Sequence, residues 1–236
     1  MRNVILAFAL CTVVPMAAQA EESIDERWNV DADAKISVEN VAGNIEIEGW
    51  DKNEVHLTGT LGDSVEELEV DETGSGLQIS VINRDERRID ETELKLRVPE
   101  SAVITASAVS ADIEISGMDN KKLTGSSVSG DVQVRATSQW VSLESVSGDV
   151  GFSGKTGRIS AESVSGDIEL SGISGSIEAT TVSGDMELEA SDMKSGKFET
   201  VSGDIEVTTD MTGNGKLRAE SMSGDVTVNL PGSQSG

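Results

Sequence analysis

The sequence predicts an all-β protein, a right-handed single-stranded β-solenoid of about 18-residue coils with an irregular N-terminal β region. The tetrad Val-Ser-Gly-Asp returns at nearly fixed spacing through the C-terminal two-thirds of the chain. Apolar and polar residues alternate with period two, and no helical periodicity is present. Aromatic residues make up only 3% of the chain, without a single Tyr. A fixed period of this length indicates one unit stacked on copies of itself, because no single unit can bury its own apolar face.

Residues 1–20 have the pattern of a secretory signal peptide. Arg2 supplies the positive start, an apolar stretch covers residues 4–14, and Ala18-Gln19-Ala20 gives a small-residue cleavage site. Cys11 follows Leu10, where a lipoprotein site requires a small residue, so lipidation is not expected. We therefore expect export to the periplasm, the cell surface or the medium. Beyond the signal, no apolar run is long enough to suggest a transmembrane segment.

Composition excludes several classes of function. Removal of Arg2 with the signal leaves 17 basic against 43 acidic residues, a net charge of −26, which argues against nucleic acid or anionic lipid as a partner. Cys11 is the only cysteine, so the mature chain has no disulfide and no His/Cys zinc site. His56 is the only histidine, and its place between Val55 and Leu57 indicates an outward position on a strand.

Pro99 divides the mature chain into an N-terminal β region, residues 21–99, which we expect to cap the stack, and a solenoid, residues 100–236. Strands are expected at 55–57, 68–70 and 77–81, the last two joined by a hairpin turn at 74–76. Residues 41–47, with Ile36 and Val38 before them, match the later repeats. In this diverged copy Asn44 takes the position of the repeated Asp.

Five complete tetrads occupy residues 128–131, 146–149, 164–167, 182–185 and 201–204, with degenerate copies at 109–112 and 222–225. Four apolar columns accompany them. The first follows each Asp (Ile113, Val132, Val150, Ile168, Met186, Ile205, Val226), and the second lies two residues further on (Ile115, Val134, Phe152, Leu170, Leu188, Val207, Val228). The third is the first residue of each tetrad, and the fourth lies upstream (Leu123, Val141, Ile159, Ile177, Leu217), with Gly196 and nearby Phe198 departing from it.

Each coil therefore holds two short strands separated by Ser-Gly, and successive coils should pair in parallel about 4.8 Å apart. An 18-residue perimeter encloses only a narrow interior, which suits aliphatic side chains and explains the scarcity of rings. A left-handed hexapeptide helix also has 18 residues per coil. It requires an aliphatic residue at every sixth position, and Ile159, Ser165 and Ser171 fail that test.

The third tetrad position is glycine, which is expected to serve a structural turn with positive φ. The residues concerned are Gly130, Gly148, Gly166, Gly184, Gly203 and Gly224. The flanking Ser and Asp side chains can bond neighbouring backbone N–H groups, so the motif is explained without any function.

The acidic residues raise a second hypothesis, because stacked coils would align like charges about 4.8 Å apart. We consider that Ca²⁺ bridges a ladder formed by Asp131, Asp149, Asp167, Asp185 and Asp204. Against this, exposed charges can splay into solvent, and the Gly-Gly-x-Gly-x-Asp pattern of calcium β-rolls is absent. No other cofactor is expected. Because every carboxylate has equivalent copies above and below it, no place is marked out as an active site, and we expect no enzymatic activity.

The unit Val-Ser-Gly-Asp-[Ile/Val]-x-[Val/Leu] resembles the repeats of the bacterial putative-adhesin family of exported β-strand-repeat domains of unknown function. Residues 41–51 resemble the opening strand pair of that family, and Leu96-Arg97-Val98-Pro99 its entry into the repeats. The resemblance covers nearly all of the mature chain and implies an envelope β-solenoid without catalytic residues. Members often continue with another coil after the equivalent of Pro231-Gly232, which points to an uncapped or truncated end.

Three functions follow from the sequence. The first is a non-enzymatic binding or scaffold module of the cell envelope, whose repeated faces contact an envelope protein or a surface polysaccharide. The alternative is a periplasmic accessory protein of envelope-stress sensing with a protein partner. The third, less favoured, is a polysaccharide-cleaving enzyme.

Overall fold

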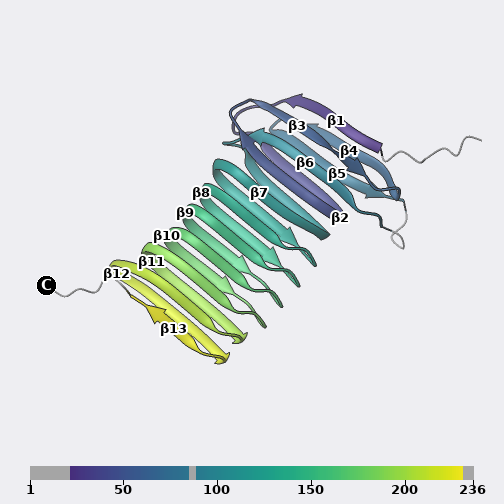
Figure 1. Ribbon diagram of the computed structural model, residues 1–236. Coiled ribbons are helices and arrows are strands. Elements are labelled where there is room, and N and C mark those ends of the chain that lie inside the picture. The colour runs from purple at the N-terminus through teal and green to yellow at the C-terminus, as the bar shows by residue number, and fades with distance from the viewer. Residues whose placement is uncertain (1–21, 85–88, 231–236) are drawn as a thin grey trace, which may run out of the picture.

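The computed structural model of the protein describes residues 22–84 and 89–230, so the predicted signal peptide at 1–20 lies outside the described residues. The fold is a rod of stacked strands (Figure 1), with β1 to β6 gathered near one end and β13 at the other. Within the described ranges, no helix is long and apolar enough to cross a membrane. The fold class is therefore the predicted β-solenoid.

Thirteen strands make up the described structure. They are β1 (Glu22–Asn29), β2 (Lys35–Trp50), β3 (Glu54–Leu61), β4 (Val65–Thr73), β5 (Gly76–Asn83), β6 (Thr92–Pro99), β7 (Val103–Ser127), β8 (Val132–Ser145), β9 (Val150–Glu162), β10 (Ile168–Thr180), β11 (Met186–Ser202), β12 (Ile205–Ser223) and β13 (Val226–Asn229). From β7 onward each strand pairs in parallel with the next, as predicted. The coils stay in register, since Ile168 lies opposite both Val150 and Met186.

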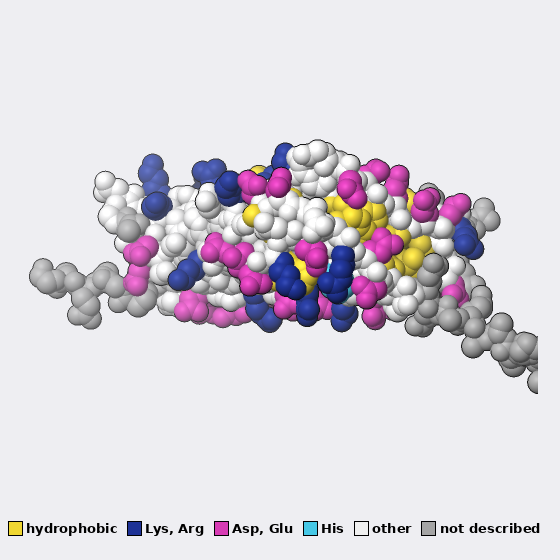
Figure 2. All heavy atoms as spheres, turned by 90° about the horizontal axis from the view of Figure 1, so that it is seen from above, with side chains coloured by type: hydrophobic (Ala, Val, Ile, Leu, Met, Phe, Trp, Pro, Cys, Tyr) yellow, Lys and Arg dark blue, Asp and Glu magenta, His cyan; other side chains and the backbone are white. Residues whose placement is uncertain are grey.

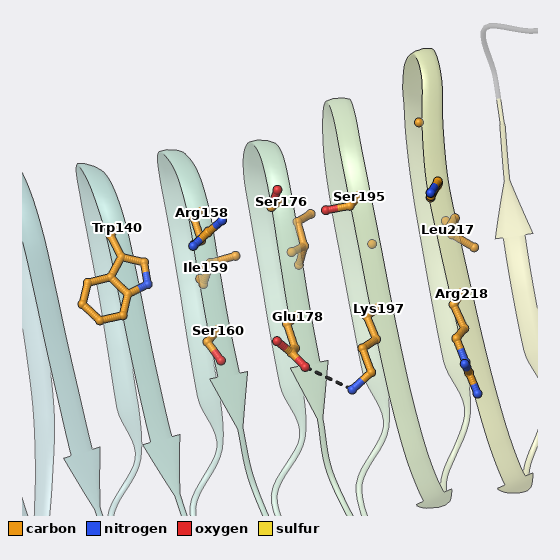
Figure 3. Close-up of a pocket in the computed structure, with 14 residues that line it drawn as sticks. Trp140, Arg158, Ile159, Ser160, Ser176, Glu178, Ser195, Lys197, Leu217 and Arg218 are labelled. Carbon is orange, nitrogen blue, oxygen red and sulfur yellow. Dashed lines mark hydrogen bonds and ion pairs between the residues drawn. The ribbon is translucent and has the colours of Figure 1, made fainter.

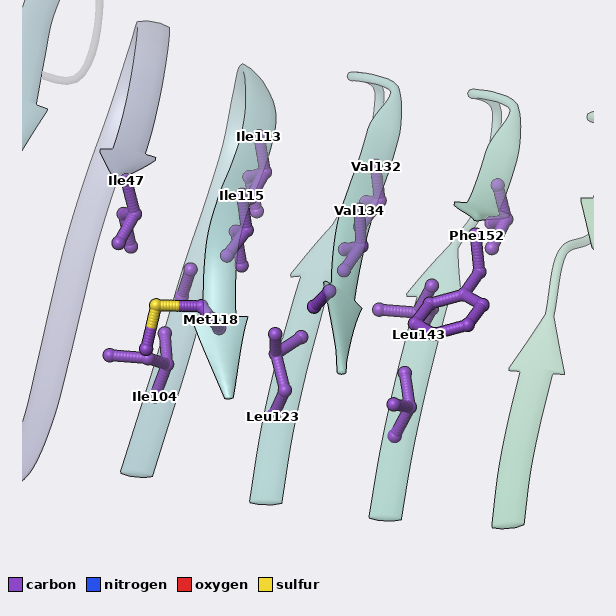
Figure 4. Close-up of a cluster of buried hydrophobic side chains, with 14 of the residues drawn as sticks. Ile47, Ile104, Ile113, Ile115, Met118, Leu123, Val132, Val134, Leu143 and Phe152 are labelled. Carbon is purple, nitrogen blue, oxygen red and sulfur yellow. The ribbon is translucent and has the colours of Figure 1, made fainter. Parts of the chain in front are cut away.

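Each long strand runs around most of one coil. In β10 the pairing is interrupted at a far bend between Ser171 and Ser176, so that the strand has a first half and a second half on either side of it. Apolar side chains from both halves point into one interior (Figure 4), which holds Ile113, Val132 and Phe152 as well as Leu123 and Leu143. The core is consequently a narrow column that follows the rod axis.

The N-terminal region is joined to this stack through β2. Its register with β7 sets Asn44 opposite Asp112 and Ile45 opposite Ile113, which confirms the predicted diverged repeat. On its other side, β2 pairs in parallel with β5 and β6, while β1, β3 and β6 pair antiparallel. The antiparallel pairing of β4 with β5, closed at Thr73 and Gly76, confirms the predicted hairpin.

Three of the four predicted apolar columns are in the core. The two columns after the Asp are buried except at the last coil, where Val226 and Val228 are 42% and 37% exposed. The upstream column is buried as well, with Leu217 partly so. Where Gly196 interrupts it, Phe198 turns inward and is fully buried. Phe198 lies opposite Ala179 and Ala219, so a large side chain two positions later fills the space that Gly196 leaves.

The third predicted column, formed by the first residue of each tetrad, does not belong to the core. Val109, Val128, Val146, Val164, Val182 and Val201 are between 43% and 49% exposed, and Met222 is 83% exposed. The reason is the strand alternation. Ala161 and Ser163 point inward, so Val164, the next residue, points outward.

Candidate functional site: the Ser-Gly-Asp edge and the β8–β12 groove

The bends that carry the tetrads form one edge of the rod, here called the Ser-Gly-Asp edge. Behind six of the seven bends lies a hydroxyl side chain whose role was not predicted, buried at five of them and part-buried at Ser221. Ser145 Oγ accepts a 3.0 Å hydrogen bond from the N–H of Gly148 and donates a 3.0 Å bond to the carbonyl of Gly130 in the preceding coil. Equivalent side chains that donate to the preceding coil are Ser127, Ser163, Thr181, Thr200 and Ser221. The signal was a hydroxyl residue directly before every copy of the tetrad except the first, which Ala108 precedes.

The tetrad aspartates form a second hydrogen-bonded column. The N–H of Asp167 donates to Asp149 Oδ1 at 2.9 Å, and the N–H of Asp149 donates to Asp131 Oδ1 at 2.8 Å. The same bond joins Asp112 to Asp131, Asp167 to Asp185, Asp185 to Asp204, and Asp204 to Asp225. One oxygen of each accepting carboxylate is thus engaged by the backbone of the next coil. No group of three or more His, Cys, Asp or Glu in residues 22–84 and 89–230 could hold a metal ion, and the Ca²⁺ ladder stays a prediction.

Of the six tetrad glycines, Gly203 (157°) and Gly224 (158°) have the predicted positive φ, and the other four do not. These four are Gly130, Gly148, Gly166 and Gly184, whereas the positive-φ residues include Gly117 (70°), Gly172 (76°) and Asp192 (55°) at the far bends. A Cβ on Gly148 would lie 2.2 Å from the carbonyl oxygen of Gly130, and the other five glycines face similar distances of 2.0–2.1 Å. Close approach of successive coils therefore excludes any side chain.

His56 lies on β3, away from both the edge and the groove described next. Its Nε2 is 2.9 Å from Asp25 Oδ1, and its ring stacks on Trp50 with a centroid separation of 6.3 Å. The side chain is 14% exposed, so it is more covered than the sequence suggested. These contacts account for it structurally.

An open groove of about 970 Å³ lies on the outer face formed by the second halves of strands β8 to β12, here called the β8–β12 groove. Register places Trp140, Arg158, Ser176, Ser195 and Lys216 in one outward column across the five strands. A second column contains Ser160, Glu178, Lys197 and Arg218. Figure 3 shows Trp140, Arg158, Ser176 and Ser195 of the first column and Ser160, Glu178, Lys197 and Arg218 of the second. The groove exists because serine stands where neighbouring coils carry Trp, Arg or Lys.

Four basic side chains line the groove, and they differ in their partners. Lys197 Nζ lies 3.1 Å from Glu178 and 3.0 Å from Glu199, and these bonds raise the pKa of its ammonium, Glu199 having the larger effect. Arg218 lies 2.7 Å from Glu220, and its hydrogen bond lowers the pKa of that carboxyl. In the part of the chain that the structure describes, neither Arg158 nor Lys216 forms an ion pair with a carboxylate.

Trp140 lines the groove at its β8 end. The side chain is 38% exposed, and Lys122 Nζ lies 4.2 Å from the centroid of its ring system. In Figure 2, several Lys and Arg side chains gather near the middle of the rod, whereas Asp and Glu are spread along its length.

Trp140, Arg158 and Ser176 each stand six residues before a tetrad, as do Ser195 and Lys216. Alignment on the tetrads would have found this column.

Comparison with known proteins identifies the family. The family described as Toastrack DUF4097 matches residues 33–236. A solved structure described as a putative adhesin from Bacteroides fragilis NCTC 9343 has a TM-score of 0.55 at 18% identity, covering 89% of this chain and 98% of that one. This likeness concerns the fold.

Two structures from Parabacteroides distasonis ATCC 8503 are less similar. One, described as a putative adhesin, has a TM-score of 0.49 at 12% identity and covers 88% of this chain and 97% of its own. The other, described as a putative lipid binding protein, has a TM-score of 0.48 at 14% identity, and the match covers 88% of this chain and 94% of that one. A search of curated proteins found no match. With nearly all of the described residues matched by its pattern, the chain belongs to the Toastrack DUF4097 family.

Proposed function

We propose that this protein is an exported, non-enzymatic binding or scaffold module of the bacterial cell envelope. The observation that carries the proposal is the β8–β12 groove, which is assembled from equivalent positions of five successive coils. A solenoid holds such positions at fixed intervals, so it presents an extended surface to an extended partner. The same surface serves either a surface polymer or a protein segment.

Export is supported by the sequence of residues 1–20, which has the three parts of a signal peptide. The B. fragilis protein that shares the fold is described as a putative adhesin, a role that requires exposure outside the cytoplasm. Both considerations favour a site in the envelope.

A binding role is favoured over catalysis by the lining of the groove. Glycoside cleavage requires two carboxyl groups, one on each side of the scissile bond. Glu178 is the one carboxylate among the described lining residues, and it is held 3.1 Å from Lys197. The groove therefore offers cations, hydroxyls and one aromatic surface, which are groups for recognition.

The proposal is tested by co-sedimentation of the purified mature protein with isolated envelopes of the source bacterium. We expect saturable retention in the pellet, with the protein alone remaining in solution. Incubation of the same envelopes should release no reducing ends. Protein that stays in the supernatant at every envelope concentration, or protein that releases sugar products, would contradict the proposal.

A further inference from the structure

We propose that the β8–β12 groove binds an acidic polysaccharide chain laid along the rod axis. The inference rests on the proposed function and names the ligand class of that site. Its basis is the combination of length, charge and surface chemistry in one groove, argued in turn below.

The length of the groove fits a polymer. Its lining runs from Trp140 on β8 to Lys216 on β12. The four inter-strand steps between them, of about 4.8 Å each, give roughly 19 Å. The groove is open and lies on an outer face, so a chain can enter from the side and continue beyond both ends. An enclosed cavity would be expected for a single small molecule.

The charge of the groove opposes that of the whole chain. The sequence carries a net charge of −25, yet the lining contains Arg158, Lys197, Lys216 and Arg218 against Glu178 alone. Lys197 and Arg218 already have carboxylate partners, whereas Arg158 and Lys216 have none among the described residues. These two cations stand three strand steps apart, roughly 14 Å. Two separated anionic groups on one ligand would satisfy both.

The remaining surface suits sugars. The half-exposed ring of Trp140 offers an apolar face on which the C–H face of a sugar can pack. Ser160, Ser176 and Ser195 line the floor, and their hydroxyls can both donate to and accept from sugar hydroxyls. A double-stranded nucleic acid offers anionic groups as well, but it carries one charge per about 1.7 Å, so the acidic remainder of the rod repels it more strongly than a polysaccharide with at most one charge per sugar. Carboxylate and phosphate groups on a polysaccharide satisfy the site equally.

The experiment measures affinity by calorimetry for polygalacturonate, for its methyl-esterified form and for a phosphate-bearing mannan. The esterified polymer has the same backbone without the charges. We expect the wild-type protein to bind at least one acidic polymer and to bind the ester at least about tenfold more weakly, with an affinity that falls as salt is raised. The two acidic polymers separate carboxylate from phosphate recognition.

Variants locate the site. Arg158→Glu and Lys216→Glu should each weaken binding at least about tenfold, because each replaces an attraction by a repulsion. Trp140→Ala should weaken it without changing its salt dependence. Lys155→Glu is the matched control, since it makes the same charge change on β9 outside the lining, and it should bind within about twofold of wild type. Unchanged circular dichroism and melting temperature verify the fold of each variant.

Three results would overturn the inference: no binding of either acidic polymer, equal affinity for the esterified polymer, or a loss in Lys155→Glu as large as in Arg158→Glu. The proposed function is judged separately. If Arg158→Glu and Lys216→Glu are still retained by envelopes, the protein remains a binding module, but the groove is not its site. If the wild-type protein is not retained by envelopes, both the proposed function and the groove as its site are refuted.

Discussion

Asp149 Oδ1 accepts a 2.9 Å hydrogen bond from the backbone N–H of Asp167, its equivalent one coil further along the chain. The repeated carboxylate is therefore an acceptor for backbone donors at a bend where the strand pairing is interrupted. This contact explains why a side chain with an oxygen acceptor is repeated at this position in spite of the repulsion between stacked charges. It also separates the role of the oxygen atom from the role of the charge.

The first prediction concerns these two roles. Asp149→Asn keeps an oxygen acceptor and removes one charge from the column, so we expect a melting temperature equal to or above that of wild type, with the gain shrinking as salt is raised. Asp149→Ala removes the acceptor and should cost about 0.5–1.5 kcal/mol. Asn44 already stands opposite Asp112 in this register. Thermal unfolding of the two variants measures the difference. If Asp149→Asn is less stable than Asp149→Ala, the hydrogen bond does not stabilise the column.

The second prediction concerns calcium. Because one oxygen of each accepting aspartate is already engaged by the next coil, cations are not needed to hold the column together. The melting temperature should be the same in EDTA and in millimolar Ca²⁺. A rise of several degrees in Ca²⁺ that disappears in Asp149→Asn would instead establish the calcium ladder.

The third prediction concerns the buried hydroxyls. Ser145→Ala leaves the N–H of Gly148 and the carbonyl of Gly130 without the partner that joins them. We expect a loss of about 1–3 kcal/mol, because both groups are buried. Ser145→Thr is the control, since Thr181 and Thr200 occupy the equivalent positions in later coils. If Ser145→Ala is as stable as Ser145→Thr, these two hydrogen bonds contribute nothing to the free energy of unfolding.

The fourth prediction concerns coil spacing. A Cβ at Gly148 would lie 2.2 Å from a carbonyl oxygen, so Gly148→Ala must push two coils apart at a cost of at least about 1–3 kcal/mol. Gly157→Ala is the control, because its Cβ would meet only a carbonyl oxygen at 3.6 Å. Chemical denaturation of both variants measures the difference, and equal stability would argue against the close approach.

The fifth prediction concerns the exchange of large and small residues in β11. Phe198→Ala should cost about 3–5 kcal/mol, because it opens a cavity beside Gly196. The double variant Gly196→Ile/Phe198→Ala reproduces the Ile177 and Ala179 pair of β10 and should recover most of that loss. Gly196→Ile alone should be destabilised, because a Cβ at this position would lie 2.7 Å from Met193 Sδ and 2.9 Å from the ring of Phe198. Additive effects in the double variant would contradict the packing account.

The architecture was predictable because it repeats. Ile168 and Leu170 have the same period-two spacing as Val150 and Phe152, and a pattern seen in coil after coil leaves little freedom in fold or register. The exposure of Val164 was predictable too, once Ser163 was taken as buried. A hydroxyl residue reads as polar in a sequence, so its burial shows only when the backbone groups it bonds are seen.

The groove was harder to predict because it arises from differences between coils. Ser176 and Ser195 form a hollow only because Arg158 and Lys216, their neighbours in register, are long. The number of residues per coil also varies near the C-terminus, where Ser195 and Lys216 are 21 residues apart. A repeat pattern describes what the coils share, so it does not show the positions at which they differ. The role of the tetrad glycines was hidden for a related reason, since Gly148 is constrained by a carbonyl 18 residues earlier in the chain.

A crystal structure of the protein with an oligosaccharide of whichever acidic polymer binds in solution tests most directly whether the outer face of β8–β12 is where this rod binds its partner. We predict electron density for the sugar chain over Ser176 and Ser195, with one end on the ring of Trp140 and acidic groups beside Arg158 and Lys216. Density along the Ser-Gly-Asp edge instead, or an empty groove at a concentration that saturates binding in solution, would contradict it.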